Sequence, residues 1–293
     1  MSQLLLNAIA NGLIVGLLYS MIGASLSLLY GVLQVKNFAH GDFLIAGAYV
    51  TYFMFRAYDI HPLVAMPVAF IGFALFGWVL YYLIMPRLRQ ADDPMLSSLL
   101  VMYGVSLMLT ATMLFIFEAD YRSLNFTFEP ISMQIGSVFL PTARIVAVAI
   151  TLVLAVALTA FLYVTLPGKA VRASIMNRDA IQIVGVNIDR LSALVFAAAL
   201  GIAGMTGVLV ALVFPSFNPF VGVDYTLIGF IVVVLGGLGN PMGAILGGLV
   251  YGLAEQVSIV FMPQSLAPIV GFTLMVLTIF FRPQGILGRS QQV

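Results

Sequence analysis

Long apolar stretches follow one another through almost the whole chain. Of its 293 residues, 62% are apolar and only 8% are Asp, Glu, Lys or Arg. A soluble domain carries about 25% charged residues, and a disordered chain is rich in charge and poor in aromatic residues. A membrane-spanning helix instead needs about 20 mostly apolar residues. The sequence therefore predicts an all-α, polytopic transmembrane helical bundle with about 8–10 spans.

Polar breaks divide the chain into nine candidate spans. They cover residues 8–33, 43–56, 63–85, 95–117, 143–165, 191–213, 225–239, 242–262 and 267–281. The stretches 43–56 and 225–239 are short, so either can be re-entrant and the number of spans can change. The N-terminus lacks a positively charged segment, so we interpret the first stretch as a span and not as a cleaved signal.

The cationic residues are divided unequally between the two sets of alternating loops. One set holds three, Arg56, Arg122 and Arg144. The other holds nine: Lys36, Arg87, Arg89, Lys169, Arg172, Arg178, Arg190, Arg282 and Arg289. Because loops rich in Lys and Arg stay in the cytoplasm, the second set is predicted to be cytoplasmic. The N-terminus is then periplasmic and the C-terminus cytoplasmic.

Several classes of function are excluded by what the sequence lacks. The net charge is +1, so no basic field is available for nucleic acid, and the absence of cysteine excludes disulfides and Cys-ligated zinc. The only Gly-Lys pair, Gly168-Lys169, is followed by Ala170, so there is no Walker A loop. We therefore expect no catalytic residues, no metal site and no cofactor.

A polar string interrupts the apolar sequence between the first two spans. It includes Asn37, Phe38, His40, Gly41 and Asp42. Non-helical backbone at membrane depth must be buried in protein or line a watery cavity, and many transporters use such broken helices at their substrate sites. The string is therefore either a broken helix beside a pathway or an ordinary cytoplasmic turn in which Asn37 and Asp42 cap helices.

A second break follows the short stretch 225–239. It contains Gly236, Gly237, Gly239 and Asn240, followed by Pro241. Interrupted segments in corresponding parts of two halves point to an internal repeat around a central site. We therefore predict one transmembrane domain over 1–293, with halves of about 1–140 and 141–293.

Glycines recur at four-residue spacing beyond the second break, in Gly243-x-x-x-Gly247 and Gly248-x-x-x-Gly252. Such faces allow close helix packing, which is the simplest interpretation of these four residues. In the same stretch, Glu255 is the only acidic residue deep within a predicted span. A charge there costs about 2.5–3.5 kcal/mol, so Glu255 should face a cavity or a partner or be protonated, unless it lies nearer the interface than expected.

Two loops are longer than simple connections require. The external loop 118–142 contains an alternating stretch from Ile131 to Gly136 and is interpreted as a small hairpin, either a connector or a docking surface for an external partner. The internal loop 166–190 contains a short amphipathic pattern in which Asn177 is a suitable N-cap and Gly185 a suitable stop. Such a helix can bind a partner's groove or lie on lipid.

Several of these strings, taken in order, resemble the H-type permease family of branched-chain amino acid ABC importers. They are Gly31-Val32 with Asn37-Phe38-Ala39-His40-Gly41-Asp42-Phe43, Gly168-Lys169-Ala170-Val171-Arg172-Ala173 with Gly185-Val186, Gly236-Gly237-Leu238-Gly239-Asn240-Pro241 with Gly243-Ala244, and Arg282-Pro283-Gln284-Gly285-Ile286-Leu287-Gly288. The resemblance covers nearly the whole chain.

The resemblance implies a type II ABC importer-like permease with broken helices in each half. Such a permease pairs with a second homologous permease and two cytoplasmic ATP-binding subunits, and receives substrate from a periplasmic substrate-binding protein. It implies that the two breaks line the substrate pathway, and we add Glu255 to the predicted pathway residues because it is the only acid deep within a span. The implied ATPase-coupling residues are Arg172, Asn177, Arg178, Asp179, Ala180, Ile183 and Gly185.

The implied function is import of branched-chain or other hydrophobic amino acids across the bacterial inner membrane. The same scaffold also serves urea, short amides and, in some members, aromatic acids, and the sequence does not separate these substrates. An ion-coupled secondary transporter is a different alternative, although such proteins use several intramembrane carboxylates and Glu255 is nearly alone here.

Overall fold

The computed structural model describes residues 2–135 and 138–288, and this part of the chain is built almost entirely from helices. The α-helices are α1 (Ser2–Leu33), α2 (His40–Tyr58), α3 (Ala65–Leu88), α4 (Pro94–Phe117), α5 (Thr142–Val164), α6 (Leu166–Met176), α7 (Arg178–Ile183), α8 (Ile188–Val213), α9 (Gly222–Gly236), α10 (Pro241–Ser258) and α11 (Ala267–Phe281). Short 3-10 turns, Pro62–Val64, Pro219–Val221 and Gln264–Leu266, precede α3, α9 and α11.

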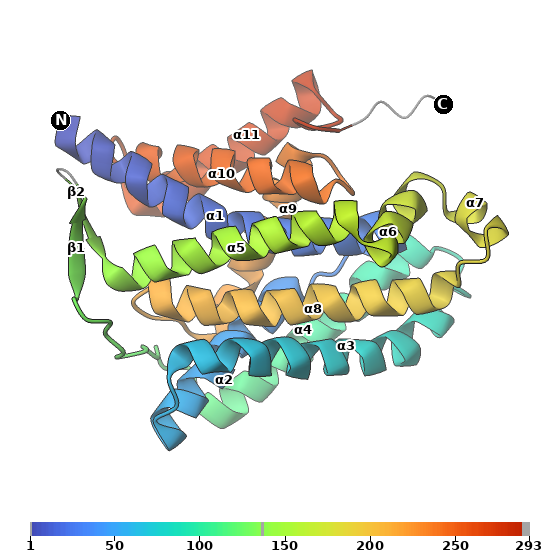
Figure 1. The fold of residues 1–293 in the computed structure, drawn as a ribbon, viewed down its shortest axis with the longest axis horizontal. Coiled ribbons are helices and arrows are strands. Elements are labelled where there is room, and N and C mark those ends of the chain that lie inside the picture. The colour runs from blue at the N-terminus through green and yellow to red at the C-terminus, as the bar shows by residue number, and fades with distance from the viewer. Residues whose placement is uncertain (1, 136–137, 289–293) are drawn as a thin grey trace.

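Two helices, α1 and α8, form the centre of the bundle (Figure 1). Their most apolar 18-residue windows are 89% and 83% buried, whereas those of α3, α4, α5 and α11 are only 11–28% buried. The outer helices are apolar on all sides, as expected for helices that face lipid. Within the described residues, seven helices are long and apolar enough to cross a membrane. The chain is therefore a multi-pass membrane protein.

The helices α2 and α10 are not among these seven, although both were expected to be spans. They are 19 and 18 residues long and less apolar, because α2 begins with His40 and Asp42 and α10 contains many glycines and Glu255. The predicted short stretch 225–239 belongs instead to a segment, Pro219–Gly236, that is long enough. The prediction that residues 242–262 form one span was wrong at its end, since α10 stops at Ser258.

The glycines of α10 pack it against two neighbours at once. A methyl group added at Gly252 or Gly248 would overlap the α1 backbone at Gly16 or Ser20, respectively. A methyl group added at Gly243 would overlap the backbone of Gly236 in α9. The two glycine repeats are therefore packing faces, as the simplest interpretation predicted.

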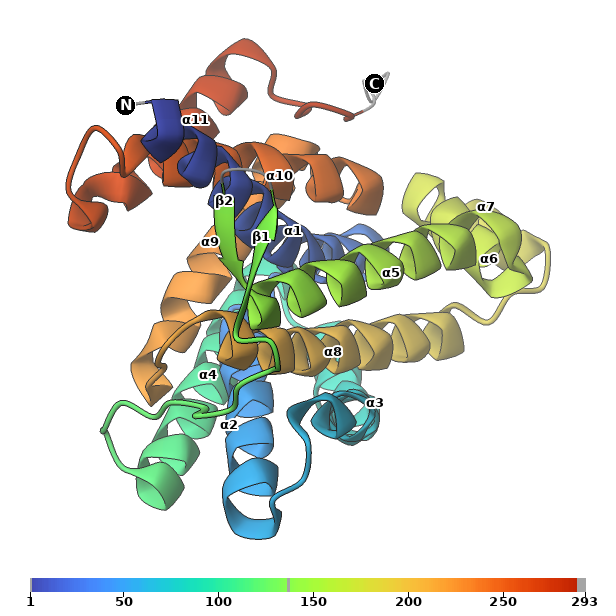
Figure 2. The ribbon, with the colours of Figure 1, turned by 60° about the vertical axis from the view of Figure 1, so that its left-hand side comes forward.

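The predicted sets of loops gather at opposite ends of the bundle. At one end, Arg122 pairs with Phe217 through the backbone, and Arg144 donates to the Asn11 side chain at 2.6 Å. The hairpin of β1 (Ser132–Ile135) and β2 (Val138–Pro141) lies at the same end, while α6 and α7 lie at the other (Figures 1 and 2). The strands are antiparallel with Ser132 opposite Pro141, which confirms the predicted hairpin, although Gly136 lies outside the described residues.

Candidate functional site

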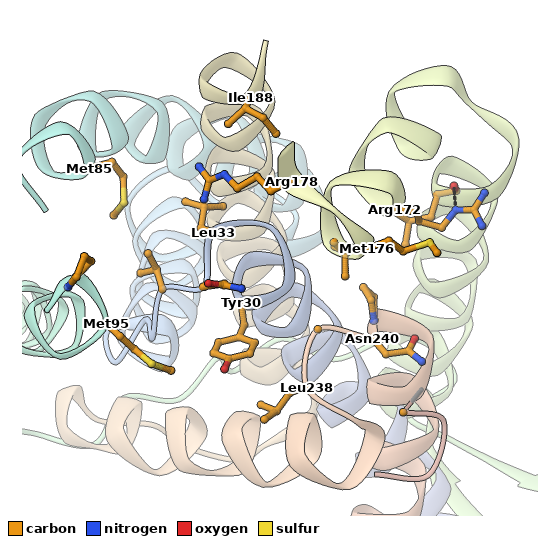
Figure 3. A pocket seen from close by; sticks show the side chains of 18 of the residues that line it. Tyr30, Leu33, Met85, Met95, Arg172, Met176, Arg178, Ile188, Leu238 and Asn240 are labelled. Atoms are coloured by element: carbon orange, nitrogen blue, oxygen red, sulfur yellow. Dashed lines mark hydrogen bonds between the residues drawn. The ribbon is translucent and has the colours of Figure 1, made fainter. Parts of the chain in front are cut away.

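A large cavity opens at the α7 end of the bundle (Figure 3). Its volume is about 1810 Å³, and its lining residues come from the segments 30–35, 85–95, 162–189, 238–242 and 283–288. Five segments predicted to share one side of the membrane therefore meet around one space. Of the nine cations assigned to that side, Arg89, Arg172 and Arg178 line the cavity, whereas Arg289 lies outside the described residues.

The first break is a non-helical segment at residues 34–39, in which Val35, Asn37 and Ala39 are buried and Gln34 is exposed. Asn37 has no exposed surface, and its side-chain oxygen accepts a hydrogen bond from the Ala39 N–H at 3.2 Å. The break is shorter than predicted, because His40, Gly41 and Asp42 already form the first turn of α2.

This first turn of α2 is held by polar contacts from three other helices. The His40 ring nitrogen Nε2 lies 2.9 Å from the Ser25 hydroxyl of α1. The Gly41 N–H donates to Thr226 of α9 at 2.8 Å, and Thr110 of α4 donates to Asp42 at 3.3 Å. The turn is packed so closely that a methyl group at Gly41 would overlap the Gly222 carbonyl of α9. Neither His40 nor Asp42 has any exposed surface.

The second break, between α9 and α10, depends on glycine backbone geometry. Gly237 and Gly239 have φ angles of +109° and +74°, which L-residues with a side chain rarely adopt. Asn240 then caps α10, because its side-chain oxygen accepts from the N–H groups of Met242 and Gly243 at 3.2 and 3.1 Å. Its amide nitrogen donates to the Leu287 carbonyl at 2.9 Å, which attaches the C-terminal segment to this break.

The two breaks flank a second, apolar cavity of about 430 Å³. The first break contributes Val35, Lys36 and Phe38, and the second contributes Leu238. The remaining lining residues are Leu26, Tyr30, Met95, Leu99, Phe230, Val233 and Val234. Four of the lining residues, Tyr30, Val35, Met95 and Leu238, also line the large cavity, so the two spaces adjoin. Figure 3 shows Tyr30, Met95 and Leu238 around this junction.

Some of the predicted pathway residues line one of the two cavities, and others line neither. Phe38 lines the apolar cavity, and Gly239 and Asn240 line the large one. The others line neither of these two cavities: Asn37, His40, Gly41, Asp42, Gly236, Gly237 and Glu255. Their role in a pathway stays a prediction. The sequence signal missed most of the apolar lining, because a Val or Leu on a cavity wall cannot be told from one in a core.

The predicted amphipathic helix is present as α7, with the expected ends. The Asn177 side-chain oxygen accepts from the N–H groups of Asp179 and Ala180 at 3.0 and 2.9 Å, and Gly185 follows with φ of +84°. Ile181 is buried beneath the helix, whereas Ile183 and Val184 are 87% and 77% exposed. The helix therefore carries an uncovered apolar surface.

Helix α6, which precedes α7, connects the exposed apolar surface of α7 to the bundle. Arg172 donates to the Leu162 carbonyl at 2.8 Å, and its guanidinium lies 4.2 Å from the centre of the Tyr163 ring. Ile175 packs at the glycines of the α1 end and the second break, Gly31 and Gly239. Arg178 extends into the large cavity (Figure 3).

A polar contact not found from the sequence joins the α7 ends of α3 and α8. Arg89 forms an ion pair with Asp189 and donates to the Tyr81 hydroxyl at 2.7 Å. No sequence pattern indicated this pair, since its members are 100 positions apart.

Glu255 lies in a cluster of tyrosines between α1 and α10. Its carboxylate accepts hydrogen bonds from Tyr19 at 3.0 Å and Tyr251 at 3.4 Å, and the two rings lie 5.3 Å apart. The partners of this intramembrane acid are thus the hydroxyl groups of Tyr19 and Tyr251. Among the described residues, no three His, Cys, Asp or Glu side chains are grouped so as to hold a metal ion.

Lipid-facing outer helices, two buried breaks and adjoining cavities between them define a membrane protein of the transport-permease class. Residues 8–279 match the family described as branched-chain amino acid transport system / permease component. The chain belongs to this family.

Curated relatives agree with this assignment over nearly full length. The chain is 28% identical to the high-affinity branched-chain amino acid transport system permease protein LivH of Salmonella typhimurium, over 96% of this chain and 94% of that protein. It is 28% identical to BraD of Pseudomonas aeruginosa over 98% and 96% of the two chains. A probable branched-chain amino acid transport permease protein LivM of Methanocaldococcus jannaschii is 29% identical over 41% of this chain and 39% of its own. No solved structure matches the chain significantly.

Proposed function

We propose that this permease forms the translocation pathway of an ABC importer for branched-chain or other hydrophobic amino acids in the bacterial inner membrane. The observation that carries the proposal is the uncovered apolar surface of α7 beside the large cavity. A chain without a Walker A loop needs a site at which a separate ATPase can act on it. The relatives named for branched-chain amino acid transport support the substrate class.

The proposed assembly contains a second homologous permease, two cytoplasmic ATP-binding subunits and a periplasmic substrate-binding protein. The α7 end then faces the cytoplasm, in keeping with the nine cations assigned to it. The N-terminus is periplasmic and the C-terminus cytoplasmic. The similarity to a LivM protein supports a related but different permease as the partner.

ATP binding on the partner chains moves α7 in this mechanism. The surface that receives the ATPase is Met176, Ala180, Ile183 and Val184, with Arg178 and Asp179 supplying polar contacts and Asn177 and Gly185 fixing the helix ends. Through Ile175, motion of this segment reaches Gly31 at the end of α1 and Gly239 in the second break. The breaks open or close the space between them, and solute passes from the apolar cavity into the large one.

Cysteine substitution in this cysteine-free chain tests the pathway. Cysteines at Phe38 and Gly239 should react with a water-soluble thiol reagent, and the rate should change when ATP is added to the assembled complex. A cysteine at Phe280, which is 78% exposed on the outer helix α11, is the lipid-facing control. Equal and unchanging rates at all three positions would contradict a pathway between the breaks.

The coupling role is tested separately by replacing Arg178 and Asp179 together with alanine. ATPase stimulation and uptake by the complete complex should both fall, because the ATPase loses its polar contacts on α7. Wild-type stimulation together with wild-type uptake would refute the assignment. Uptake that persists without any ATPase subunit would instead support an ion-coupled transporter.

A further inference from the structure

The apolar cavity has the size and surface of a small-molecule site. Its volume of about 430 Å³ lies within the range of about 300–1,000 Å³ of ligand pockets. Part of its wall is aromatic, since Tyr30, Phe38 and Phe230 line it and the ring centres of Phe38 and Phe230 lie 6.5 Å apart. Urea or a short amide would lose hydrogen bonds to water here without replacement, whereas an aliphatic side chain would gain by burial.

One cationic residue, Lys36, is among the residues that line this cavity. Lys36 is one of only two lysines in the chain, and it lies in the first break. Its backbone N–H donates to the Ser98 hydroxyl of α4 at 3.3 Å, which fixes the main chain at this point. The ion pairs within the described residues are Arg89–Asp189 and Arg122–Glu118, so Lys36 has no carboxylate partner there.

The C-terminal ends of two helices lie beside the same cavity. The helix α1 ends at Leu33 and α9 at Gly236, and a methyl group at Gly31 would contact the carbonyl of Gly239 at 3.0 Å. Helix C-termini carry partial negative charge and favour cations. The cavity thus has an apolar interior, a cation on one wall and two helix C-termini near it.

We propose that this cavity is a transient binding site for an aliphatic α-amino acid, with the side chain among Phe38, Phe230 and Val234 and the carboxylate on Lys36. The inference rests on the proposed function and adds the residues that recognise the substrate inside the permease. Tyr30, Val35, Met95 and Leu238 separate this site from the large cavity, so they form the exit. None of these residues except Phe38 carries a sequence signal for transport.

The charge on Lys36 is tested in the complete complex, with the binding protein saturated by leucine. The measurement is leucine transported per ATP hydrolysed, which a change in the binding protein's affinity does not affect. Lys36→Met should lower this ratio about tenfold, since a hydrogen bond to a charged group contributes enough for a factor of that order. Lys36→Arg should keep most of it. Arg190→Met, which removes a cation from the same side but outside both cavities, is the matched control.

The apolar interior is tested by filling it. Val234→Trp should abolish leucine transport while ATPase stimulation by the binding protein remains. Val79→Trp, at a 64% exposed position of the outer helix α3, is the control for adding the same bulk and should transport normally.

The possible results separate the inference from the proposed function. If the wild-type complex imports no aliphatic amino acid, both the proposed substrate class and this occupant are wrong. If it does import leucine but Lys36→Met and Val234→Trp transport normally, only the inference is wrong. A loss of thermal stability in both variants without a change in transport per ATP would identify a lipid-filled cavity or a purely structural lysine, which also overturns it.

Discussion

Replacing Gly252 by alanine should separate α1 from α10 and destabilise the whole bundle. The added methyl group would overlap the backbone of Gly16 and lie 2.9 Å from the Gly12 carbonyl. Backbone atoms cannot rotate away as a flexible side chain can, so the two helices must move apart. The α1–α10 contact is the most extensive between any two described elements, and the strain is therefore placed at the centre of the fold.

The magnitude follows from two opposing contributions. Extra methylene groups in a packed core cost about 1–3 kcal/mol, and backbone overlap places Gly252→Ala towards the upper end. Replacing a mid-helix glycine by alanine, by itself, raises the free energy of unfolding by about 0.5–1 kcal/mol. The expected net loss in the free energy of unfolding is therefore about 1–2 kcal/mol, from the difference of these two contributions.

Gly104 in α4 provides the matched control, because nothing lies within 4 Å of a methyl group added there. Gly104→Ala should be neutral or stabilising by up to about 1 kcal/mol. Unfolding of both variants is followed by helical circular dichroism during SDS titration in mixed micelles. If Gly252→Ala is as stable as the wild type, or if both variants shift in the same direction, the packing argument is refuted.

Three further predictions concern polar contacts. Asn177→Ala removes the acceptor of two α7 N–H groups and should cost about 1 kcal/mol of local stability, seen as faster hydrogen exchange over residues 178–183, whereas Asn177→Asp should retain protection. Glu255→Leu leaves the Tyr19 and Tyr251 hydroxyls without their acceptor and should cost about 1–3 kcal/mol in the same SDS titration; adding Tyr19→Phe should recover part of the loss, and no recovery would contradict this account. Asp189→Asn should cost less than about 1 kcal/mol, because the side chains of this ion pair are 40% and 63% exposed; a larger loss, or one that persists in high salt, would argue against a surface pair.

The parts of the fold that could be predicted are those set by local chemistry. Apolar stretches located the helices, and the cap at Asn177 and the stop at Gly185 were correct because each depends on neighbours within a few residues. The hairpin near Ser132 was found from alternation in the same way. Helix ends were less accurate, since His40 and Asp42 look like loop residues but are held in α2 by distant hydroxyl groups.

The site could be predicted only where a residue type is unusual for its position. Two breaks in apolar sequence stand out, and both border the apolar cavity. Phe230 and Val234 do not stand out, because a membrane helix is made of such residues on every face. Their exposure to the cavity depends on how α9 is rotated against α1 and α4, which is a property of the assembled bundle.

The deep burial of α1 has a consequence for biosynthesis. This helix is made before the other described helices, yet its main contacts, α8, α9 and α10, all come from residues 188–258. A growing chain must therefore hold α1, with its glycine and serine face uncovered, until residues beyond 241 enter the membrane. Chains that terminate early lack the surface that covers this face, so they should be preferred substrates of membrane quality control.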